Sequence, residues 1–208
     1  KTGASTMSTV SRLGLFGGTF NPPHLAHLAI AEAMGDALGL EQVLWMPAAA
    51  SPFKVGDPAA VSAEHRLAMV RLATADNPRF AVSDLELRRA GVSYTVDTVE
   101  ALREAQPDRA LTLLLGGDSL ASFTRWHRWE DLLATVRIAV YARPGSTLAD
   151  LPEAVRARTT FVEAPALDLS STVLRKRLME GQTIRYLVPE ALRSYIAQHG
   201  LYQKRATA

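Results

Sequence analysis

The stretch Gly17-Gly18-Thr19-Phe20-Asn21-Pro22-Pro23-His24-Leu25-Ala26-His27 is the most informative segment of this 208-residue chain. It follows the short apolar run Leu13–Phe16, which predicts a strand that ends at the glycine pair. The two glycines allow the backbone to approach a ligand closely and to adopt positive φ angles. Because a residue before proline avoids the helical region, the next helix should begin near His24.

His24 and His27 give this segment its chemistry. They are three residues apart, so they share one face of the first helical turn. Backbone N–H groups in that turn lack intrahelical acceptors and favour a phosphate group, to which two imidazoles can donate further hydrogen bonds. The alternatives are an ordinary loop with two solvated histidines, or a zinc site, for which a third ligand would be needed. The whole string behind a strand favours the phosphate site.

Short apolar runs alternate with longer amphipathic stretches along the rest of the chain. Strands are predicted at Leu13–Phe16, Gln42–Met46, Phe80–Val82, Ala110–Leu115, Val136–Ala142 and Thr159–Glu163. Helices are predicted at Leu25–Leu38, Ala63–Ala75, Thr95–Ala105, Ser119–Ala134, Ser171–Met179 and Pro189–His199. The alternation predicts an α/β fold with a doubly wound, mostly parallel sheet flanked by helices. Ligands bind such sheets at the carboxyl ends of the strands, where the strand order reverses.

Composition limits the function classes. Of the chain's residues, 48% are hydrophobic and 21% are charged, so a chain of this length can bury a complete hydrophobic core. It has no cysteine, so disulfides and thiolate metal sites are excluded. The net charge of +2 does not favour a nucleic-acid or membrane-surface protein, and no apolar run reaches the ~20 residues of a membrane span. We expect a cytoplasmic protein in which residues 1–6 are a cloning remnant and residues 7–208 form one domain.

A second candidate anion site lies at Leu169–Arg177. Ser170, Ser171 and Thr172 precede an apolar helical run, as helix-capping residues do. A capped helix with a solvated basic face is the plain interpretation. Arg175 beside the hydroxyl groups would instead complete a site for a phosphate. Residues 171–208 hold seven Lys or Arg against two acids, which favours an anionic ligand here.

Other polar residues follow predicted strands on the ligand side of the sheet. Asp118, directly after a buried strand, could accept hydrogen bonds from ribose hydroxyls or could cap a helix. Trp126 and Trp129 are three residues apart, so one of them is expected in the core, whereas an exposed indole could stack on an aromatic ligand. Lys54 and Arg143 also lie in loops that leave strands on this side.

The first string resembles the G-T-F-x-P-x-H-x-x-H pattern of the nucleotidylyltransferase superfamily, whose histidines hold the triphosphate of ATP or CTP. The second segment is similar to its I-S-S-T-x-I-R signature. Further likenesses lie in Ser93–Thr98, in the spacing from Asp118 to Trp126 and in a proline-rich loop that ends at Lys54. From about Leu13 to Tyr202 the chain resembles the bacterial nicotinate-nucleotide adenylyltransferases. Phe53 departs from the family, where histidine is frequent at that position.

The resemblance implies roles for individual residues. Catalytic roles fall to His24, His27 and Arg175. ATP or phosphate contacts fall to Gly17, Gly18, Thr19, Phe20, Lys54, Ser170, Ser171, Thr172 and Arg175. Contacts to nicotinate mononucleotide fall to Thr95, Asp118, Trp126 and Arg143.

The implied reaction joins ATP to nicotinate mononucleotide, with attack of the 5′-phosphate on the α-phosphorus and release of pyrophosphate. Mg²⁺ would arrive with the ATP phosphates, and no protein side chain is assigned to it. No nucleic-acid or membrane partner is expected, and a homo-oligomer is left open. The alternatives are an adenylyltransferase for another acceptor, a cytidylyltransferase, a non-catalytic nucleotide sensor, and an RNA-binding relative of the class I aminoacyl-tRNA synthetases.

Overall fold

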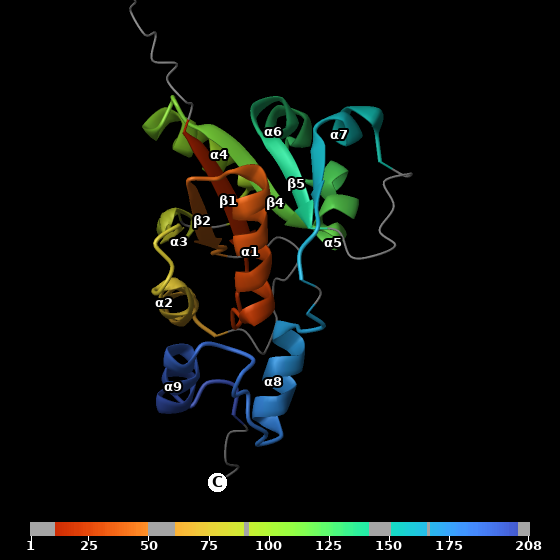
Figure 1. Cartoon of the computed structure of the whole chain (residues 1–208). Helices are drawn as coiled ribbons and strands as arrows, with labels where there is room; N and C mark the ends of the chain where they lie inside the picture. Colours follow the sequence, from red (N-terminus) through yellow and green to blue (C-terminus); the bar gives the residue numbers. More distant parts are fainter. Residues whose placement is uncertain (1–10, 50–60, 90–91, 142–150, 166, 204–208) are drawn as a thin grey trace, which may run out of the picture.

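The computed structural model describes residues 11–49, 61–89, 92–141, 151–165 and 167–203. In this part of the chain, six parallel strands form one sheet in the order β3-β2-β1-β4-β5-β6 (Figure 1). The strands are β1 (Arg12–Gly18), β2 (Gln42–Pro47), β3 (Phe80–Val82), β4 (Ala110–Gly116), β5 (Arg137–Tyr141) and β6 (Thr159–Val162). The predicted doubly wound parallel sheet is confirmed, and its order reverses between β1 and β4. Ligands of such sheets bind at the carboxyl ends of the strands at that point.

The helices largely follow the predicted pattern. They are α1 (Leu25–Leu38), α2 (Ala63–Thr74), α3 (Leu85–Arg88), α4 (Thr95–Ala105), α5 (Gly117–Ala121), the 3₁₀ turn η1 (Phe123–Arg125), α6 (Trp129–Thr135), α7 (Glu153–Ala157), α8 (Ser171–Met179) and α9 (Glu190–Gln198). The helical stretch expected at Ser119–Ala134, in one or two pieces, consists of the three short pieces α5, η1 and α6. None of the helices in the described residues is long and apolar enough to cross a membrane.

The two faces of the sheet carry separate hydrophobic clusters, because successive side chains of a strand point to opposite sides. Leu13 and Leu15 of β1 face the cluster that α4 and α6 cover. Phe16, one residue further, faces the cluster that includes Met34 of α1 and the fully buried Trp45 of β2. The sheet therefore lies between helical layers, with α1 on one face and α4 and α6 on the other.

The C-terminal helices α8 and α9 lie beyond the carboxyl ends of the strands (Figure 1). A third cluster attaches them to α2, and it consists of Met69, Ala73, Leu174, Ile184, Val188, Leu192, Ile196 and Leu201. These apolar contacts fix the position of the hydroxyl-rich start of α8. The last fifth of the chain thus lies over the carboxyl ends of the strands, where ligands are expected.

We predict that Gly14 is required for close packing between β1 and its neighbours. A Cβ atom at Gly14 would lie 2.6 Å from Leu40 Cδ1 and 3.0 Å from Leu114 Cδ1. Gly14→Ala should therefore lower the free energy of unfolding by about 1–3 kcal/mol, as overpacking of a core does. Gly17 lies on the same strand, and a methyl group added there would meet nothing within 4 Å. Gly17→Ala should change stability by less than about 0.5 kcal/mol. Urea denaturation measures the free energy of unfolding of both variants. Equal losses of stability in the two variants would contradict the packing argument.

Candidate active site

The loop between β1 and α1 turns at Phe20 rather than at the glycine pair. Phe20 has a φ of 48°, whereas neither Gly17 nor Gly18 has a positive φ. The freedom of the two glycines to adopt a positive φ is not used, because both remain part of β1. Gly18 has a different reason to lack a side chain: a Cβ there would lie 3.0 Å from the Phe20 ring. The ring of Phe20 is buried and packs against His27, with centroids 5.3 Å apart.

His24 and His27 form a stacked pair at the start of α1. His24 is the N-cap residue, and the two ring centroids are 3.7 Å apart at an interplanar angle of 23°. The backbone N–H of His24 donates to Nδ1 of His27 at 3.2 Å. Because Nδ1 of His27 accepts this hydrogen bond, the neutral ring carries its proton on Nε2. The predicted sharing of one helix face by the two histidines is confirmed.

Burial controls the charge of His24, which is only 4% exposed. Loss of solvation lowers the pKa of His24 from 6.5 to about 4. The ring is therefore neutral at physiological pH and offers one N–H donor and one acceptor. A neutral donor can bind a phosphate oxygen and needs no counter-charge when the phosphate is away.

The prediction of unpaired N–H groups in the first turn of α1 is wrong for three residues. His24 donates to its partner ring as described, and the N–H of His27 donates to the carbonyl of His24 at 2.9 Å. The N–H of Leu25 donates to the carbonyl of Leu187, in the segment between α8 and α9, at 3.0 Å. The anion-binding capacity of this turn therefore lies mainly in side-chain donors.

The start of α8 is attached to the β1–α1 loop. Ser170 caps the helix by accepting from the Val173 N–H at 3.3 Å, as predicted. Ser171 Oγ donates to the carbonyl of Pro22 at 2.7 Å, and Arg175 Nη1 donates to the carbonyl of Asn21 at 2.9 Å. The two predicted phosphate segments, about 150 residues apart in sequence, are thus neighbours in the fold.

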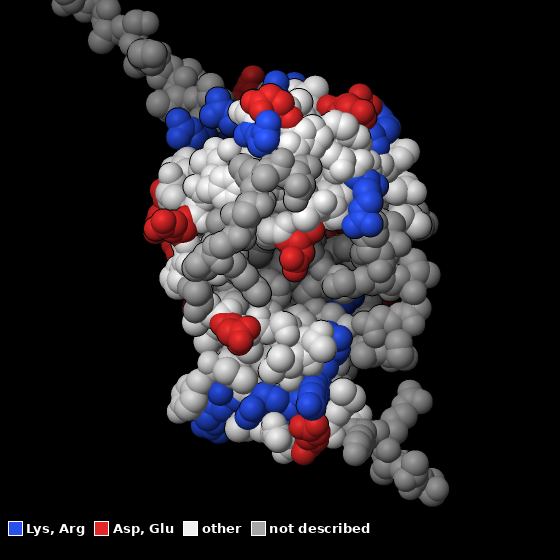
Figure 2. All heavy atoms as spheres, turned by 90° about the vertical axis from the view of Figure 1, so that its right-hand side faces the viewer, with Lys and Arg blue, Asp and Glu red and all other residues white. Residues whose placement is uncertain are grey.

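One basic side chain of α8, that of Arg175, contacts this junction. Arg175 Nη2 also donates to Thr172 Oγ1 at 3.4 Å, and Lys176 and Arg177 follow on the same helix. Figure 2 shows Lys and Arg gathered over the lower part of one face, where α8 lies, below a hollow in the surface. Of the described basic residues near the end of the chain, Arg175 therefore lies beside the loop with the histidines, where its charge would stabilise an anionic ligand.

Two residues of this region had no role in the sequence interpretation. Arg66 of α2 is only 4% exposed, and it donates to the carbonyls of Thr19 at 3.0 Å and Ala49 at 3.1 Å. Tyr202 donates from its hydroxyl to Asn21 Oδ1 at 2.6 Å. Both contacts join segments that are far apart in sequence, so no local pattern indicates them. Arg66 joins the loops that follow β1 and β2.

The residues predicted to bind the acceptor follow β4 or precede α4. Asp118 is exposed in the first turn of α5, and the N-cap of that helix is Gly116, so the alternative of Asp118 as a cap is wrong. Thr95 is the first residue of α4. Trp126 is half-buried, and its Nε1 donates to Ser122 Oγ at 3.4 Å. Its indole therefore has both a core side and a side open to solvent.

The Thr95 and Trp126 segments meet through an aromatic contact. The rings of Tyr94 and His127 have centroids 4.3 Å apart. Trp126 and Trp129 both pack at the edge of the core without being fully buried, so the expectation that one of them is a core residue is met only in part. An aromatic surface thus lies between the start of α4 and the turn before α6.

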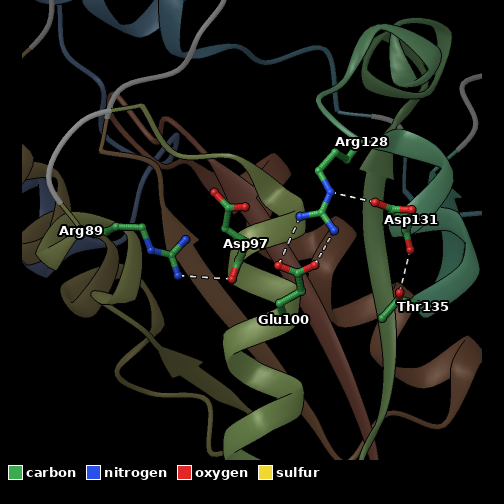
Figure 3. A network of polar contacts seen from close by, with 6 residues as sticks. All are labelled: Arg89, Asp97, Glu100, Arg128, Asp131 and Thr135. Carbon is green, nitrogen blue, oxygen red and sulfur yellow. Dashed lines mark hydrogen bonds and ion pairs between the residues drawn. The ribbon is translucent and has the colours of Figure 1, made fainter.

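A polar network holds this turn against α4 (Figure 3). Arg128, which has a φ of 51°, donates to Glu100 Oε1 of α4 and to Asp131 Oδ2 of α6, each at 2.7 Å. Thr135 Oγ1 donates to the carbonyl of Asp131 at 2.6 Å. Exposed ion pairs contribute little stability singly, but a network that ties two helices fixes the turn between them.

Three residues of the sequence interpretation lie outside the described residues. They are Lys54, predicted to contact phosphate, Arg143, predicted to contact the acceptor, and Phe53. Of the other predicted site residues, the structure joins those at residues 17–27 directly to those at residues 170–175. Asp118 is placed at the carboxyl end of β4, which pairs with β1.

Comparison with known proteins agrees with this geometry. A model of the cytidylyltransferase-like family matches residues 15–177. The "probable nicotinate-nucleotide adenylyltransferase" of Herpetosiphon aurantiacus is 47% identical over 199 residues, which cover 93% of this chain and 99% of that protein. The protein of the same name from Salinibacter ruber is 46% identical, over 92% of this chain and 97% of its own length.

A solved structure shows the same fold at low sequence identity. Nicotinic acid mononucleotide adenylyltransferase of Plasmodium falciparum, complexed with NaAD, superimposes with a TM-score of 0.75 at 18% identity. The match covers 92% of this chain and 97% of that one. From the family model and the curated relatives together, the chain belongs to the cytidylyltransferase-like family and, within it, to the nicotinate-nucleotide adenylyltransferases.

Proposed function

We propose that this chain transfers the adenylyl group of ATP to nicotinate mononucleotide, which yields nicotinate adenine dinucleotide and pyrophosphate in NAD biosynthesis. The observation that carries the proposal is the stacked pair His24 and His27 at the carboxyl end of β1, with Arg175 attached to the same loop. The names of relatives that are 46–47% identical support the same acceptor.

The reaction needs no protein nucleophile. The 5′-phosphate oxygen of the mononucleotide attacks the α-phosphorus of ATP in line, and the bond to pyrophosphate breaks. Catalysis then consists of positioning and of stabilising the charge that moves to the leaving group. The imidazoles of His24 and His27 and the guanidinium of Arg175 would bind the triphosphate and the departing pyrophosphate. Gly17, Gly18, Thr19 and Phe20 would shape the backbone beside it, with Ser170, Ser171, Thr172 and Lys54 as further phosphate contacts.

The acceptor would occupy the aromatic surface beside Thr95 and Trp126. The solvent-exposed side of the Trp126 indole suits stacking on a pyridinium ring, which is flat and cationic. Thr95, at the start of α4, would lie near the nicotinate carboxylate, because helix N-termini favour anions. Asp118 would accept hydrogen bonds from ribose hydroxyls, and Arg143 would contact the acceptor from the loop after β5.

We also propose Mg²⁺ as the accompanying ion. Imidazoles, hydroxyls and a guanidinium group are suited to phosphate oxygens, whereas Mg²⁺ takes oxygen ligands and keeps several waters. This donor set fits an ion that remains on the phosphates of ATP. When bound there, Mg²⁺ would neutralise charge on the triphosphate, while the protein side chains orient the phosphate oxygens.

Pyrophosphate release tests the proposed reaction. With ATP and Mg²⁺, we expect kcat/KM for nicotinate mononucleotide to exceed that for nicotinamide mononucleotide by about tenfold or more. A hydrogen bond to a charged group contributes about 1.5–3 kcal/mol, or about 10–100-fold. Phosphopantetheine should give no release. Equal use of the two pyridine nucleotides would overturn the carboxylate specificity, and no release with either would overturn the reaction.

The neutral state of His24 predicts an acid-sensitive fold. Its pKa is 6.5 when unfolded and about 4 when folded, so between these values the unfolded chain binds more protons. Stability is therefore present above pH 6.5 and is lost as the pH falls toward 4. Burial raises the pKa of Glu86, which acts in the opposite direction, so a comparison with a variant is needed.

We expect wild-type protein to lose about 2 kcal/mol more unfolding free energy between pH 7 and pH 4.5 than His24→Asn does. Asparagine is a good N-cap residue, so the variant should keep α1. Urea titrations at several pH values measure the difference. Parallel pH profiles for the two proteins would show that His24 is not held neutral by the fold.

A further inference from the structure

The β1–α1 loop is held by the C-terminal end of the chain. Tyr202, beyond the last helix, donates from its hydroxyl to Asn21 Oδ1 at 2.6 Å. Asn21 is only 3% exposed, and it precedes His24 by three residues. Its own carbonyl accepts from Arg175 Nη1. Asn21 therefore joins the C-terminal tyrosine to an arginine and to the histidine loop.

The backbone around Tyr202 is shaped to make this contact. Gly200 takes a φ of 59° and ends α9, and the N–H of Leu201 donates to the carbonyl of Ile196 at 3.1 Å. Leu201 is buried in the cluster that α2, α8 and α9 share. Tyr202 then takes a φ of 63°, which L-residues rarely adopt. Such a conformation persists where the surroundings enforce it, and this is frequent at functional sites.

The surroundings of the phenol also fit a donor role. Its oxygen lies 3.9 Å from Met69 Sδ of α2, one helical turn from the buried Arg66. Burial raises the pKa of Tyr202, although Arg175 and Arg66 act against the shift, so the hydroxyl keeps its proton at neutral pH. A protonated phenol beside an amide oxygen donates a hydrogen bond and adds no charge to the site.

We infer that Tyr202 is a positioning residue for adenylyl transfer, which acts through Asn21 on the loop that carries His24 and on Arg175. The inference rests on the proposed function. Loss of the hydroxyl leaves the Asn21 amide without this donor, so the loop and the guanidinium attached to it can shift. Small displacements of groups that stabilise a transition state lower turnover, and about 1 Å can cost about a hundredfold.

The test compares Tyr202→Phe with Tyr195→Phe by steady-state pyrophosphate release at 25 °C. The hydroxyl of Tyr195 in α9 is hydrogen-bonded to His65 Nδ1 of α2 at 2.8 Å, so removal of that hydroxyl serves as the matched control. Tyr202→Phe should lower kcat about tenfold and change the KM of each substrate by less than about threefold. Tyr195→Phe should keep kcat within about twofold. Circular dichroism must show both variants folded at that temperature.

Asn21→Ala provides the second variant and completes a double-mutant cycle. If the hydroxyl acts through Asn21, the double variant should be no slower than Asn21→Ala alone. Three results would each overturn the role of Tyr202. They are an unchanged kcat in folded Tyr202→Phe, equal losses of kcat in the two tyrosine variants, and additive losses of kcat in the double-mutant cycle. Absence of pyrophosphate release by the wild-type protein would instead overturn the proposed function, so the two failures are distinguishable.

Discussion

Each of three carbonyls in the loop after β1 is held by a side-chain donor from another part of the chain. Arg66 donates to the carbonyl of Thr19. Arg175 donates to the carbonyl of Asn21, and Ser171 donates to the carbonyl of Pro22. Buried carbonyl groups must be paired, because an unpaired one costs about 1–3 kcal/mol. These contacts therefore fix the loop in one conformation. The stacked histidines, and the placement of α8 beside them, depend on that conformation.

The fold separates the tasks of the site. The first turn of α1 and the start of α8 present neutral and cationic donors, which suit a triphosphate. The start of α4 and the Trp126 turn present aromatic rings, held together by Tyr94 with His127 and by the Arg128 network. Because β1 and β4 are neighbours at the switch point, both groups follow the same edge of the sheet. Under the proposed function, the two substrates would meet at this edge of the sheet.

Local signals in the sequence are sufficient to predict most elements. Leu25–Leu38 is predicted with the bounds that the structure has, because its apolar residues are spaced for one helix face, and Gly39 caps its end. Ser170 is predicted as a cap on its residue type alone. The glycine pair is misleading because glycine permits a positive φ without requiring one, and Phe20 makes the turn instead. Arg66 and Tyr202 could not be found, since their partners are 47 and 181 residues away and no periodicity links them.

Histidine ring resonances test the central claim most directly, namely that the paired imidazoles of the loop bind the triphosphate. The chain has five histidines, so a ¹⁵N spectrum of their rings is simple to assign. His65 and His199 pack with Tyr195 between α2 and α9 and serve as internal references. With a non-hydrolysable ATP analogue and Mg²⁺, the ring nitrogens of His24 and His27 should shift while those two references stay unchanged. Saturating binding of the analogue with no shift at His24 and His27 would contradict the account.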